Sequence, residues 1–339
     1  MAKIMVTGGL GYIGSHTVLE LVNAGFEPVI VDNLSNSSED VLTRLQELTG
    51  QKLSFIKADL SIKSEVVAVF DQHLDLQAVI HFAAYKAVGE SVAKPLEYYN
   101  NNLGSLVYIL QEMRARDLDN FIFSSSCTVY GQAEKLPITE DSPVVPAESP
   151  YGNTKQVGEE IISDAVEAHK FNAIALRYFN PVGAHPSAKI GELPLGVPLN
   201  LVPFVTQTAA GIREQLSVFG NDYPTRDGTA IRDYIHVVDL AKAHVVAARR
   251  LLEKENSENF EVFNLGTGTG STVLEVIKAF EESTGLDLNY RITDRRPGDI
   301  TAAYADTTRA NEVLGWKAEK TLADAMADAW RWEKKIRNL

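Results

Sequence analysis

The segment VTGGLGYIG at residues 6–14 restricts what this chain can fold into more than any other feature. It follows a short apolar run, and Gly8, Gly11 and Gly14 have the spacing G-x-x-G-x-x-G. A strand that turns sharply into a helix needs a residue that tolerates a positive φ. A pyrophosphate pressed against such a turn needs backbone without a Cβ, and the helix N-terminus offers it free N–H groups. The segment therefore predicts a strand–loop–helix unit that binds a dinucleotide.

An acidic residue at the end of the next predicted strand indicates which dinucleotide this unit prefers. Asp32 follows the apolar run 28–31 and lies 18 residues after Gly14. A carboxylate in this place accepts hydrogen bonds from a ribose hydroxyl and repels a 2′-phosphate. We therefore predict that the chain binds NAD rather than NADP. A glycine-rich turn without a ligand is the weaker interpretation, because strand, helix and acid all stand at the required spacing.

The composition excludes several classes of protein. With 339 residues, the chain is long enough for two lobes. A net charge of −13 argues against a broad nucleic-acid or anionic membrane surface. The sequence has no 18-residue apolar run and no room for a signal peptide before its first predicted strand. The only cysteine, Cys127, excludes an internal disulfide, and together these features predict a cytoplasmic protein.

The order of the apolar stretches predicts an α/β fold. Strand candidates lie at residues 4–6, 29–32, 54–57, 78–82, 121–125 and 173–178, and amphipathic helix candidates at 15–23, 41–48, 64–72, 102–117 and 151–169. Such alternation is typical of a Rossmann-like, doubly wound parallel sheet. Right-handed crossovers place the carboxyl ends of all its strands on one edge, where ligands bind. We assign residues 1–180 to this NAD-binding domain.

Beyond residue 180 the character of the sequence changes, because Gly, Pro and Asn become frequent over residues 181–230 and the loops lengthen. We predict that residues 181–339 form a smaller α/β lobe that binds the substrate. Residues 233–252 are predicted to be helical. Part of the stretch 233–265 is predicted to return to the first domain.

A second pattern indicates chemistry at the sheet edge. Ser126 follows a predicted strand, and a helix is predicted to begin at Ser149-Pro150. Tyr151 and Lys155 lie four residues apart on one face of that helix. A free phenol titrates near 10, but a nearby ammonium lowers its pKa by about 1–3 units. We therefore predict a base that takes a hydroxyl proton, with Ser126 as its hydrogen-bond partner, while the carbon loses hydride to NAD. An ordinary surface Tyr and Lys is the alternative interpretation.

Other conspicuous residues are predicted to be structural. Cys127 is expected to point to the opposite face of its strand from Ser126 and to fill the core. His81 is expected to be a satisfied core histidine, and the seven histidines show no close pair with metal-ligand spacing. The segment GTGTG at 266–270 lacks a following acid at the distance a second dinucleotide site needs.

Longer stretches carry a resemblance that covers essentially the whole chain. They read VTGGLGYIGSH, VDNLSNSS, HFAAYKAVGESVAKPLEYYNNN, FIFSSSCTVYG, SPYGNTK, LRYFNPVGAHPS, FGNDYPTRDGTAIRDYIHVVDLA, FNLGTGTGSTVLEV and RRPGDI. On these residues the chain resembles the extended short-chain dehydrogenase/reductase family. The third, sixth and seventh stretches are the most specific, and they resemble the branch of that family that epimerises UDP-hexoses. In this family, segment 266–270 is a structural turn.

The resemblance implies a mechanism. Tyr151 removes the proton of the sugar 4-hydroxyl, Ser126 is its hydrogen-bond partner, and Lys155 tunes the phenol. Hydride passes from C4 to tightly held NAD, the 4-keto sugar rotates about its link to UDP, and hydride returns to the other face. The chain is thereby expected to be an isomerase that interconverts UDP-glucose and UDP-galactose, with no net oxidation.

The resemblance also assigns binding residues. Those expected to contact NAD are Gly8, Gly11, Tyr12, Ile13, Asp32, Asn33, Asn36, Ser37, Asp59, Leu60, Phe82, Ala83, Lys86, Asn101, Tyr151, Lys155 and Tyr178. Those expected to contact the UDP-sugar are Ser126, Tyr151, Asn180, Asn200, Leu201, Phe219, Arg232, Arg296, Asp299 and Ala303. Arg232 and Arg296 would pair with the diphosphate, since a guanidinium suits bidentate phosphate binding. Surface ion pairs are the alternative interpretation for both arginines.

One departure from the family bears on substrate breadth. Members restricted to glucose and galactose nucleotides tend to carry a large aromatic residue where this chain has Ala303, while members that accept N-acetylated sugars carry a small one. Tyr304 follows directly, so a slip of one residue would restore the aromatic side chain. With the small Ala303 at this position, the resemblance implies that UDP-GlcNAc and UDP-GalNAc are also accepted.

The resemblance further implies a homodimer. Apolar residues on the predicted helices 102–117 and 151–169 exceed the needs of one buried face: Leu103, Leu106, Leu110, Val157, Ile161 and Ala165. Two such helices per subunit could pair across a two-fold axis as a four-helix bundle.

Alternative functions fit the residues less well. A nucleotide-sugar 4,6-dehydratase of the same family needs an Asp–Glu pair directly after Thr128, where this chain has Val129-Tyr130. A reductase that uses NADPH would want a basic residue near the ribose instead of Asp32. A non-catalytic NAD-sensing regulator would have lost the Tyr and Lys of the catalytic pattern. Another NAD-dependent nucleotide-sugar epimerase stays open as well.

Overall fold

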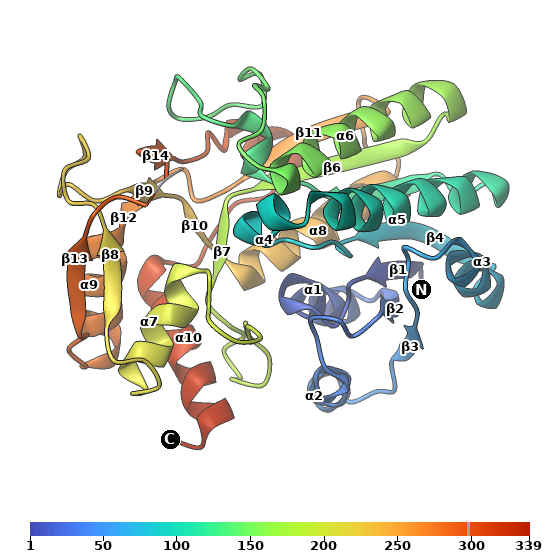
Figure 1. The fold of residues 1–339 in the computed structure, drawn as a ribbon. Helices are drawn as coiled ribbons and strands as arrows, with labels where there is room; N and C mark the ends of the chain where they lie inside the picture. The colour runs from blue at the N-terminus through green and yellow to red at the C-terminus, as the bar shows by residue number, and fades with distance from the viewer. Residues whose placement is uncertain (297–298) are drawn as a thin grey trace.

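A seven-stranded sheet forms the centre of the first lobe (Figure 1). The computed structural model describes residues 1–296 and 299–339, so the two middle residues of the RRPGDI stretch lie outside the described residues. The strand order is β11-β6-β5-β4-β1-β2-β3, and every neighbouring pair is parallel. The strands are β1 (Lys3–Thr7), β2 (Glu27–Asp32), β3 (Ser54–Lys57), β4 (Leu76–His81), β5 (Asn120–Ser124), β6 (Asn172–Tyr178) and β11 (Phe260–Leu265). The predicted doubly wound α/β fold is confirmed.

Helices cover both faces of this sheet because each face is apolar. One face packs against α1 (Tyr12–Asn23), α2 (Glu39–Thr49) and α8 (Val237–Leu252). The other packs against α3 (Lys63–Gln72), α5 (Pro95–Ala115) and α6 (Pro150–His169), and the short α4 (Val88–Ala93) precedes α5. Buried side chains such as Ile4, Ile30 and Ile122 are fully shielded from solvent. Each such residue stabilises the fold by about 1.5–3 kcal/mol.

Local chemistry sets the ends of the helices. The Oγ of Ser149 accepts a hydrogen bond of 3.1 Å from the Gly152 amide, so α6 begins at Pro150 as predicted from Ser-Pro. Helix α5 begins at Pro95, seven residues earlier than predicted. Proline is favoured in the first turn of a helix, where its missing N–H costs no hydrogen bond. The predicted helix 233–252 is wrong over its first four residues. There, β10 (Tyr234–His236) pairs with β7 (Asn180–Val182), and α8 begins only at Val237.

The second lobe is built from small sheets and three helices. Its sheets are β10-β7, β12-β9-β14 and β13-β8, with β8 (Leu216–Phe219), β9 (Ile231–Arg232), β12 (Ser271–Thr272), β13 (Tyr290–Thr293) and β14 (Ala302–Ala303). Its helices are α7 (Leu201–Ala209), α9 (Val273–Thr284) and α10 (Leu322–Arg337), which enclose a separate apolar core. Strand β11 belongs to the large sheet, and helix α8 packs against one face of that sheet. The chain therefore returns to the first lobe within residues 237–265.

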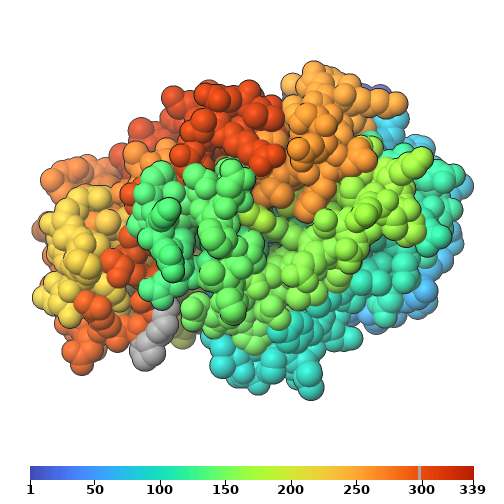
Figure 2. Space-filling view, turned by 90° about the horizontal axis from the view of Figure 1, so that it is seen from above, coloured from blue at the N-terminus to red at the C-terminus, as the bar shows by residue number. Residues whose placement is uncertain are grey.

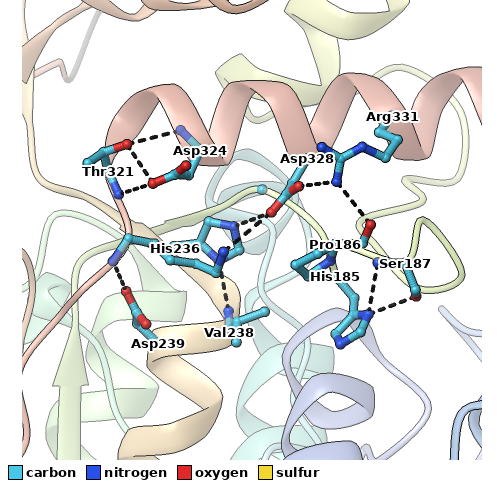
Figure 3. Close-up of polar contacts among 12 residues, drawn as sticks. His185, Pro186, Ser187, His236, Val238, Asp239, Thr321, Asp324, Asp328 and Arg331 are labelled. Carbon is cyan, nitrogen blue, oxygen red and sulfur yellow. Dashed lines mark hydrogen bonds and ion pairs between the residues drawn. The ribbon is translucent and has the colours of Figure 1, made fainter.

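A polar cluster around the buried residues His236 and Asp328 connects the C-terminal helix α10 to the strand β10 (Figure 3). The Nε2 atom of His236 lies 3.2 Å from Oδ2 of Asp328, and its Nδ1 accepts a hydrogen bond of 3.1 Å from the Val238 amide. Arg331 donates from Nη1 to Oδ1 of Asp328 at 2.6 Å and to the carbonyl of Pro186 at 2.9 Å. The cluster therefore joins α10, the start of α8 and the loop after β7.

The segment between β5 and α6 crosses from the first lobe to the second. The backbone of Ile138 accepts a hydrogen bond of 2.7 Å from Asp306 and donates one of 2.9 Å to Tyr304. In the space-filling view this segment, drawn in green, lies against red-orange residues of the second lobe (Figure 2). Among the described residues, no helix is long and apolar enough to cross a membrane.

Candidate active site

The glycine loop has the geometry that the sequence predicts for a pyrophosphate site. Gly8 has a φ of +65°, and a Cβ added to it would come within 2.9 Å of the Ala83 nitrogen. A Cβ on Gly14 would come within 2.2 Å of the Gly8 carbonyl oxygen. Helix α1 follows directly, with Gly11 as its N-cap and without a side-chain cap. The loop thus presents bare backbone and an uncapped helix N-terminus, which fits the diphosphate of a dinucleotide.

Asp32 ends β2 beside this loop, and its carboxylate is fixed in place. Its Oδ2 accepts a hydrogen bond of 3.0 Å from the Leu10 amide, and its Oδ1 accepts from the Leu34 amide at 2.9 Å and from Ser37 at 2.8 Å. Each carboxylate oxygen has room for about two hydrogen bonds, so Oδ2 keeps capacity for a ribose hydroxyl. The residues present therefore fit NAD.

Replacing Asp32 by alanine is expected to weaken retention of NAD and to relax discrimination against NADP. The substitution removes both the acceptor for the ribose and the charge that repels a 2′-phosphate. Cofactor content after gel filtration and competition between the two dinucleotides measure the effect. Asp40→Ala, an exposed acid on α2, is the matched control. Unchanged content and selectivity would mean that Asp32 does not contact the ribose.

Three further residues expected to contact NAD, Asn33, Asp59 and Phe82, follow the carboxyl ends of β2, β3 and β4. The Nδ2 of Asn33 donates to Oδ2 of Asp59 at 3.4 Å. Burial acts to raise the pKa of Asp59, but hydrogen bonds from Ser61 and Asn33 outweigh it and hold that pKa below its ordinary value. Phe82 follows β4 and packs on the ring of His244, with ring centroids 4.6 Å apart.

Two other residues expected to contact NAD also touch the second lobe. Tyr12, at the start of α1, donates from its hydroxyl to the carbonyl of Gly183 at 2.7 Å. The Nζ of Lys86 lies 3.3 Å from a carboxylate oxygen of Glu192. The predicted cofactor edge is therefore continuous with the lobe predicted to bind the substrate.

The predicted catalytic residues lie at the end of β5 and the start of α6. The Nζ of Lys155 donates to the carbonyl of Ser124 at 2.6 Å and lies 5.9 Å from the centroid of the Tyr151 ring. Tyr178, at the end of β6, shares a hydrogen bond of 2.5 Å with the Oγ of Ser124. Ser126 caps a short 3₁₀ turn by accepting from the Thr128 amide at 3.2 Å. The fold thus brings Ser126, Tyr151 and Lys155 together.

The predicted lowering of the Tyr151 pKa by Lys155 is wrong for the chain by itself. Burial raises the pKa of the phenol far above its ordinary value, a contribution from Tyr178 adds to that, and the hydrogen bond from Ser126 acts against both. Burial also lowers the pKa of Lys155, to about 8. Desolvation disfavours the charged form of both groups, and it outweighs the contributions that act in the other direction.

Apart from Ser126 and Tyr151, the residues expected to hold the UDP-sugar come from separate segments of the second lobe. The Nη2 of Arg232 lies 3.9 Å from Oδ1 of Asp299, and the Nη2 of Arg296 lies 2.7 Å from the same oxygen. Phe219 ends β8 with its ring 5.4 Å below the Arg296 guanidinium. Asn180 begins β7, Asn200 precedes α7 and Leu201 begins it. Two guanidinium groups on one carboxylate leave a net positive charge where a diphosphate is predicted.

Ala303 lies on the strand next to Arg232, in parallel register with it. It is buried in a small cluster with Phe179, and Cys127 packs against that cluster. Tyr304 is directed elsewhere, since its ring is a near neighbour of Gly270, the residue directly before β12. The aromatic side chain therefore does not take the place of Ala303.

The interpretation of Cys127 needs correction. Strand β5 ends at Ser124, and Cys127 begins a 3₁₀ turn, so strand alternation does not decide its direction. Burial raises the pKa of its thiol to about 12, which leaves it protonated at neutral pH. His81 is a satisfied core residue as predicted. Its Nδ1 lies 2.8 Å from the hydroxyl of Thr7, and burial lowers its pKa to about 3.

One buried ionic group escaped the sequence reasoning. Glu159, one turn after Lys155, forms an ion pair of 2.5 Å with Arg177 of β6, and both side chains are buried. Loss of one partner from such a pair costs about 3–5 kcal/mol. In a sequence, an acid four residues after a lysine is typical of an exposed ion pair on a helix surface. Only the structure shows that Glu159 is buried and pairs with Arg177. Within residues 1–296 and 299–339, no three His, Cys, Asp or Glu side chains are placed to hold a metal ion.

Strand order, glycine loop and the Ser–Tyr–Lys group together define a dinucleotide-dependent enzyme of the short-chain dehydrogenase/reductase class. Residues 5–329 match the family described as GDP-mannose 4,6 dehydratase. The chain belongs to the NAD-dependent epimerase/dehydratase family, the extended branch of that class.

Within the family, the chain is similar to UDP-glucose 4-epimerases over its whole length. It is 54% identical to the Bacillus subtilis enzyme of that name over 331 residues, 97% of this chain and 96% of the relative. Two solved UDP-glucose 4-epimerases share its fold. One, from Stenotrophomonas maltophila, holds NAD and formylated UDP-arabinopyranose, with 44% identity, a TM-score of 0.96 and coverage of 100% of this chain and 99% of that one. The other, from Bifidobacterium longum, holds NAD⁺ and UDP, with 46% identity, a TM-score of 0.94 and coverage of 99% of both chains.

Proposed function

We propose that this chain is an NAD-dependent UDP-glucose 4-epimerase that interconverts UDP-glucose and UDP-galactose. The observation that carries the proposal is that Ser126, Tyr151 and Lys155 lie together at the same edge of the sheet as the glycine loop and Asp32. The similarity to UDP-glucose 4-epimerases extends over essentially the full chain, so both lobes take part in it.

The chain's own residues prepare one sugar hydroxyl for reaction. The Oη of Tyr151 takes the proton of the sugar 4-hydroxyl, and the Oγ of Ser126 hydrogen-bonds to the same group. The Nζ of Lys155, anchored to the Ser124 carbonyl, provides positive charge near the phenol. The glycine loop and Asp32 would hold NAD, which would supply a reversible hydride acceptor for the sugar C4. Because burial raises the Tyr151 pKa in the chain alone, the proton transfer depends on positive charge supplied beside the phenol.

The second lobe holds the nucleotide. Arg232 and Arg296 pair with the diphosphate, and Asp299 orients both guanidinium groups while accepting from the ribose. A firm hold on the diphosphate leaves the sugar free to turn about its link to UDP. The small Ala303 beside Arg232 leaves room for a 2-acetamido group, so we extend the substrates to UDP-GlcNAc and UDP-GalNAc.

A 4,6-dehydratase is the alternative that the family profile raises. It requires an acid pair directly after Thr128 to remove water from the sugar. In the structure Val129 and Tyr130 occupy that place, and both are fully buried. The Tyr130 hydroxyl is engaged by Asn264 and Arg177, so it is not free for acid–base chemistry.

The test is direct. Purified protein should retain NAD and interconvert UDP-glucose and UDP-galactose without added cofactor. Release of a 4-keto-6-deoxy sugar would instead indicate a dehydratase. Bound NAD without any turnover of UDP-hexoses would favour a sensor.

A homodimer is the expected assembly. Helices α5 and α6 lie side by side and carry a half-exposed apolar strip of Leu103, Val157, Ile161 and Ala165. Leu106 and Leu110 do not belong to it, because they are buried within the subunit. Pairing of two such strips would form a four-helix bundle. Sedimentation at micromolar concentration should give twice the mass of the chain, and a monomeric mass would refute the prediction.

A further inference from the structure

Three consecutive serines at the end of β5 hold three different groups. Ser124 accepts from Lys155 through its carbonyl and bonds to Tyr178 through its hydroxyl. Ser126 lies beside the Tyr151 phenol and caps the next turn. Ser125, between them, donates from its buried hydroxyl to Oε1 of Glu159 at 2.5 Å. The middle serine thus ties the strand end to an acid that the proposed chemistry does not use.

The carboxylate of Glu159 is held from a second side by Arg177. The Nε of Arg177 lies 3.0 Å from Oε1, and its Nη2 lies 2.5 Å from Oε2. Arg177 is itself fixed, because its Nη1 donates to the Tyr130 hydroxyl at 2.9 Å. Glu159 and Arg177 are 8% and 7% exposed, so the pair is shielded from solvent.

Stability alone does not account for this pair. Taking two charges out of water is costly, and apolar residues of similar size often serve a core equally well. The position of the pair points to a role at the site, because Glu159 lies one helical turn beyond Lys155 on the buried face of α6. Burial lowers the pKa of Lys155 to about 8, and the charge of Glu159 acts in the opposite direction.

We propose that Glu159 is a positioning residue for the reaction, whose fixed carboxylate keeps the buried ammonium of Lys155 protonated at neutral pH. The proposal rests on the proposed function, in which Lys155 acts as a cation beside Tyr151. Ser125 and Arg177 hold the carboxylate in place, one helical turn from Lys155 on the same buried face of α6.

The remaining groups around Lys155 do not replace this charge. The titratable groups next to Lys155 are His81 of β4, and Tyr151 and Glu159 of α6 itself. Tyr98 of α5, Cys127 of the turn after β5 and Tyr178 of β6 act on Tyr151, and Arg177 of β6 lies behind Glu159. Burial keeps His81 neutral and Cys127 protonated at pH 7. Glu159 is therefore the anion in this set, and without it Arg177 would stand as an unpaired cation. Both changes lower the pKa of Lys155.

The sign of the pH effect follows. A lysine whose pKa falls loses its proton at a lower pH, so activity that needs the ammonium is lost earlier as the pH rises. For Glu159→Gln, we expect the alkaline limb of the kcat profile to move down by about one to two pH units. Activity near pH 6 should stay within a few-fold of wild type. A purely structural role would lower kcat at every pH without moving the limb.

Matched variants isolate the charge. Glu160→Gln changes the exposed neighbouring acid in the same way and should leave the limb in place. If Glu159→Gln does not fold, the double variant Glu159→Gln/Arg177→Gln leaves no buried unpaired charge. Its limb should also lie below that of wild type. A limb at the wild-type position in whichever of the two variants folds would overturn the proposal.

A second readout does not depend on turnover. The ¹³Cε resonance of Lys155, assigned by its loss in Lys155→Met, should titrate at lower pH in Glu159→Gln than in wild type. An unchanged midpoint would overturn the proposal even if the kinetics differ. Failure of the proposed function is distinct, since wild-type protein would then not interconvert UDP-hexoses while this titration could still be measured.

Discussion

Tyr151→Phe is expected to lower the rate of UDP-glucose and UDP-galactose interconversion by about 10²–10⁴-fold, the usual contribution of a positioned acid–base group. The ring stays beside Lys155, and only the hydroxyl proposed to exchange a proton with the sugar is removed. Paired kcat measurements on both UDP-hexoses give the size of the effect.

Folding and NAD content should persist in this variant, because the glycine loop and Asp32 are expected to hold the dinucleotide independently of the phenol. Tyr290→Phe, an exposed tyrosine on β13, serves as the matched control and should leave the rate unchanged. An activity of Tyr151→Phe within a few-fold of wild type would reject Tyr151 as the base.

Ala303→Tyr is expected to abolish conversion of UDP-GlcNAc to UDP-GalNAc and to spare that of UDP-glucose to UDP-galactose. A rigid ring beside the sugar excludes the acetamido group in both ground and transition states. Such a clash can exceed the ~1–3 kcal/mol that a missing methylene contributes to discrimination. Paired kinetics on both substrate pairs, wild type against variant, measure it.

The neighbouring position offers a control. Ala302→Tyr places the same ring on the opposite face of β14, since side chains alternate along a strand, and should not discriminate between the substrates. Wild-type protein without activity on UDP-GlcNAc would show that another residue closes the pocket. Loss of both activities in Ala303→Tyr would indicate misfolding and not selective exclusion.

Local patterns in the sequence predict most of the first lobe. The glycine spacing places a strand before residue 8 and a helix after residue 11, and the structure has β1 and α1 there. Ser149-Pro150 marks the start of α6 correctly. These features are decided within a few residues by φ preferences and capping, so a single segment carries the information.

Where distant partners compete with local preference, the sequence alone is misleading. Residues 234–236 have helical neighbours, yet they form β10 because β7 offers them parallel partners. The direction of Cys127 cannot be derived from strand alternation, since the strand has already ended. Leu106 and Leu110 pack within the subunit and not at its surface, because the sheet face beside α5 takes them up.

The sequence by itself determined the doubly wound fold, through the order of its apolar stretches, and the dinucleotide loop and the Tyr151–Lys155 pair, through residue types at short, fixed spacing. Only the tertiary structure decided that Glu159 and Arg177 meet in the core behind Lys155, that Ala303 and not Tyr304 lies beside Phe179, and that burial raises the pKa of Tyr151. Desolvation and side-chain direction depend on everything packed around a group, and those neighbours come from segments far apart in the chain.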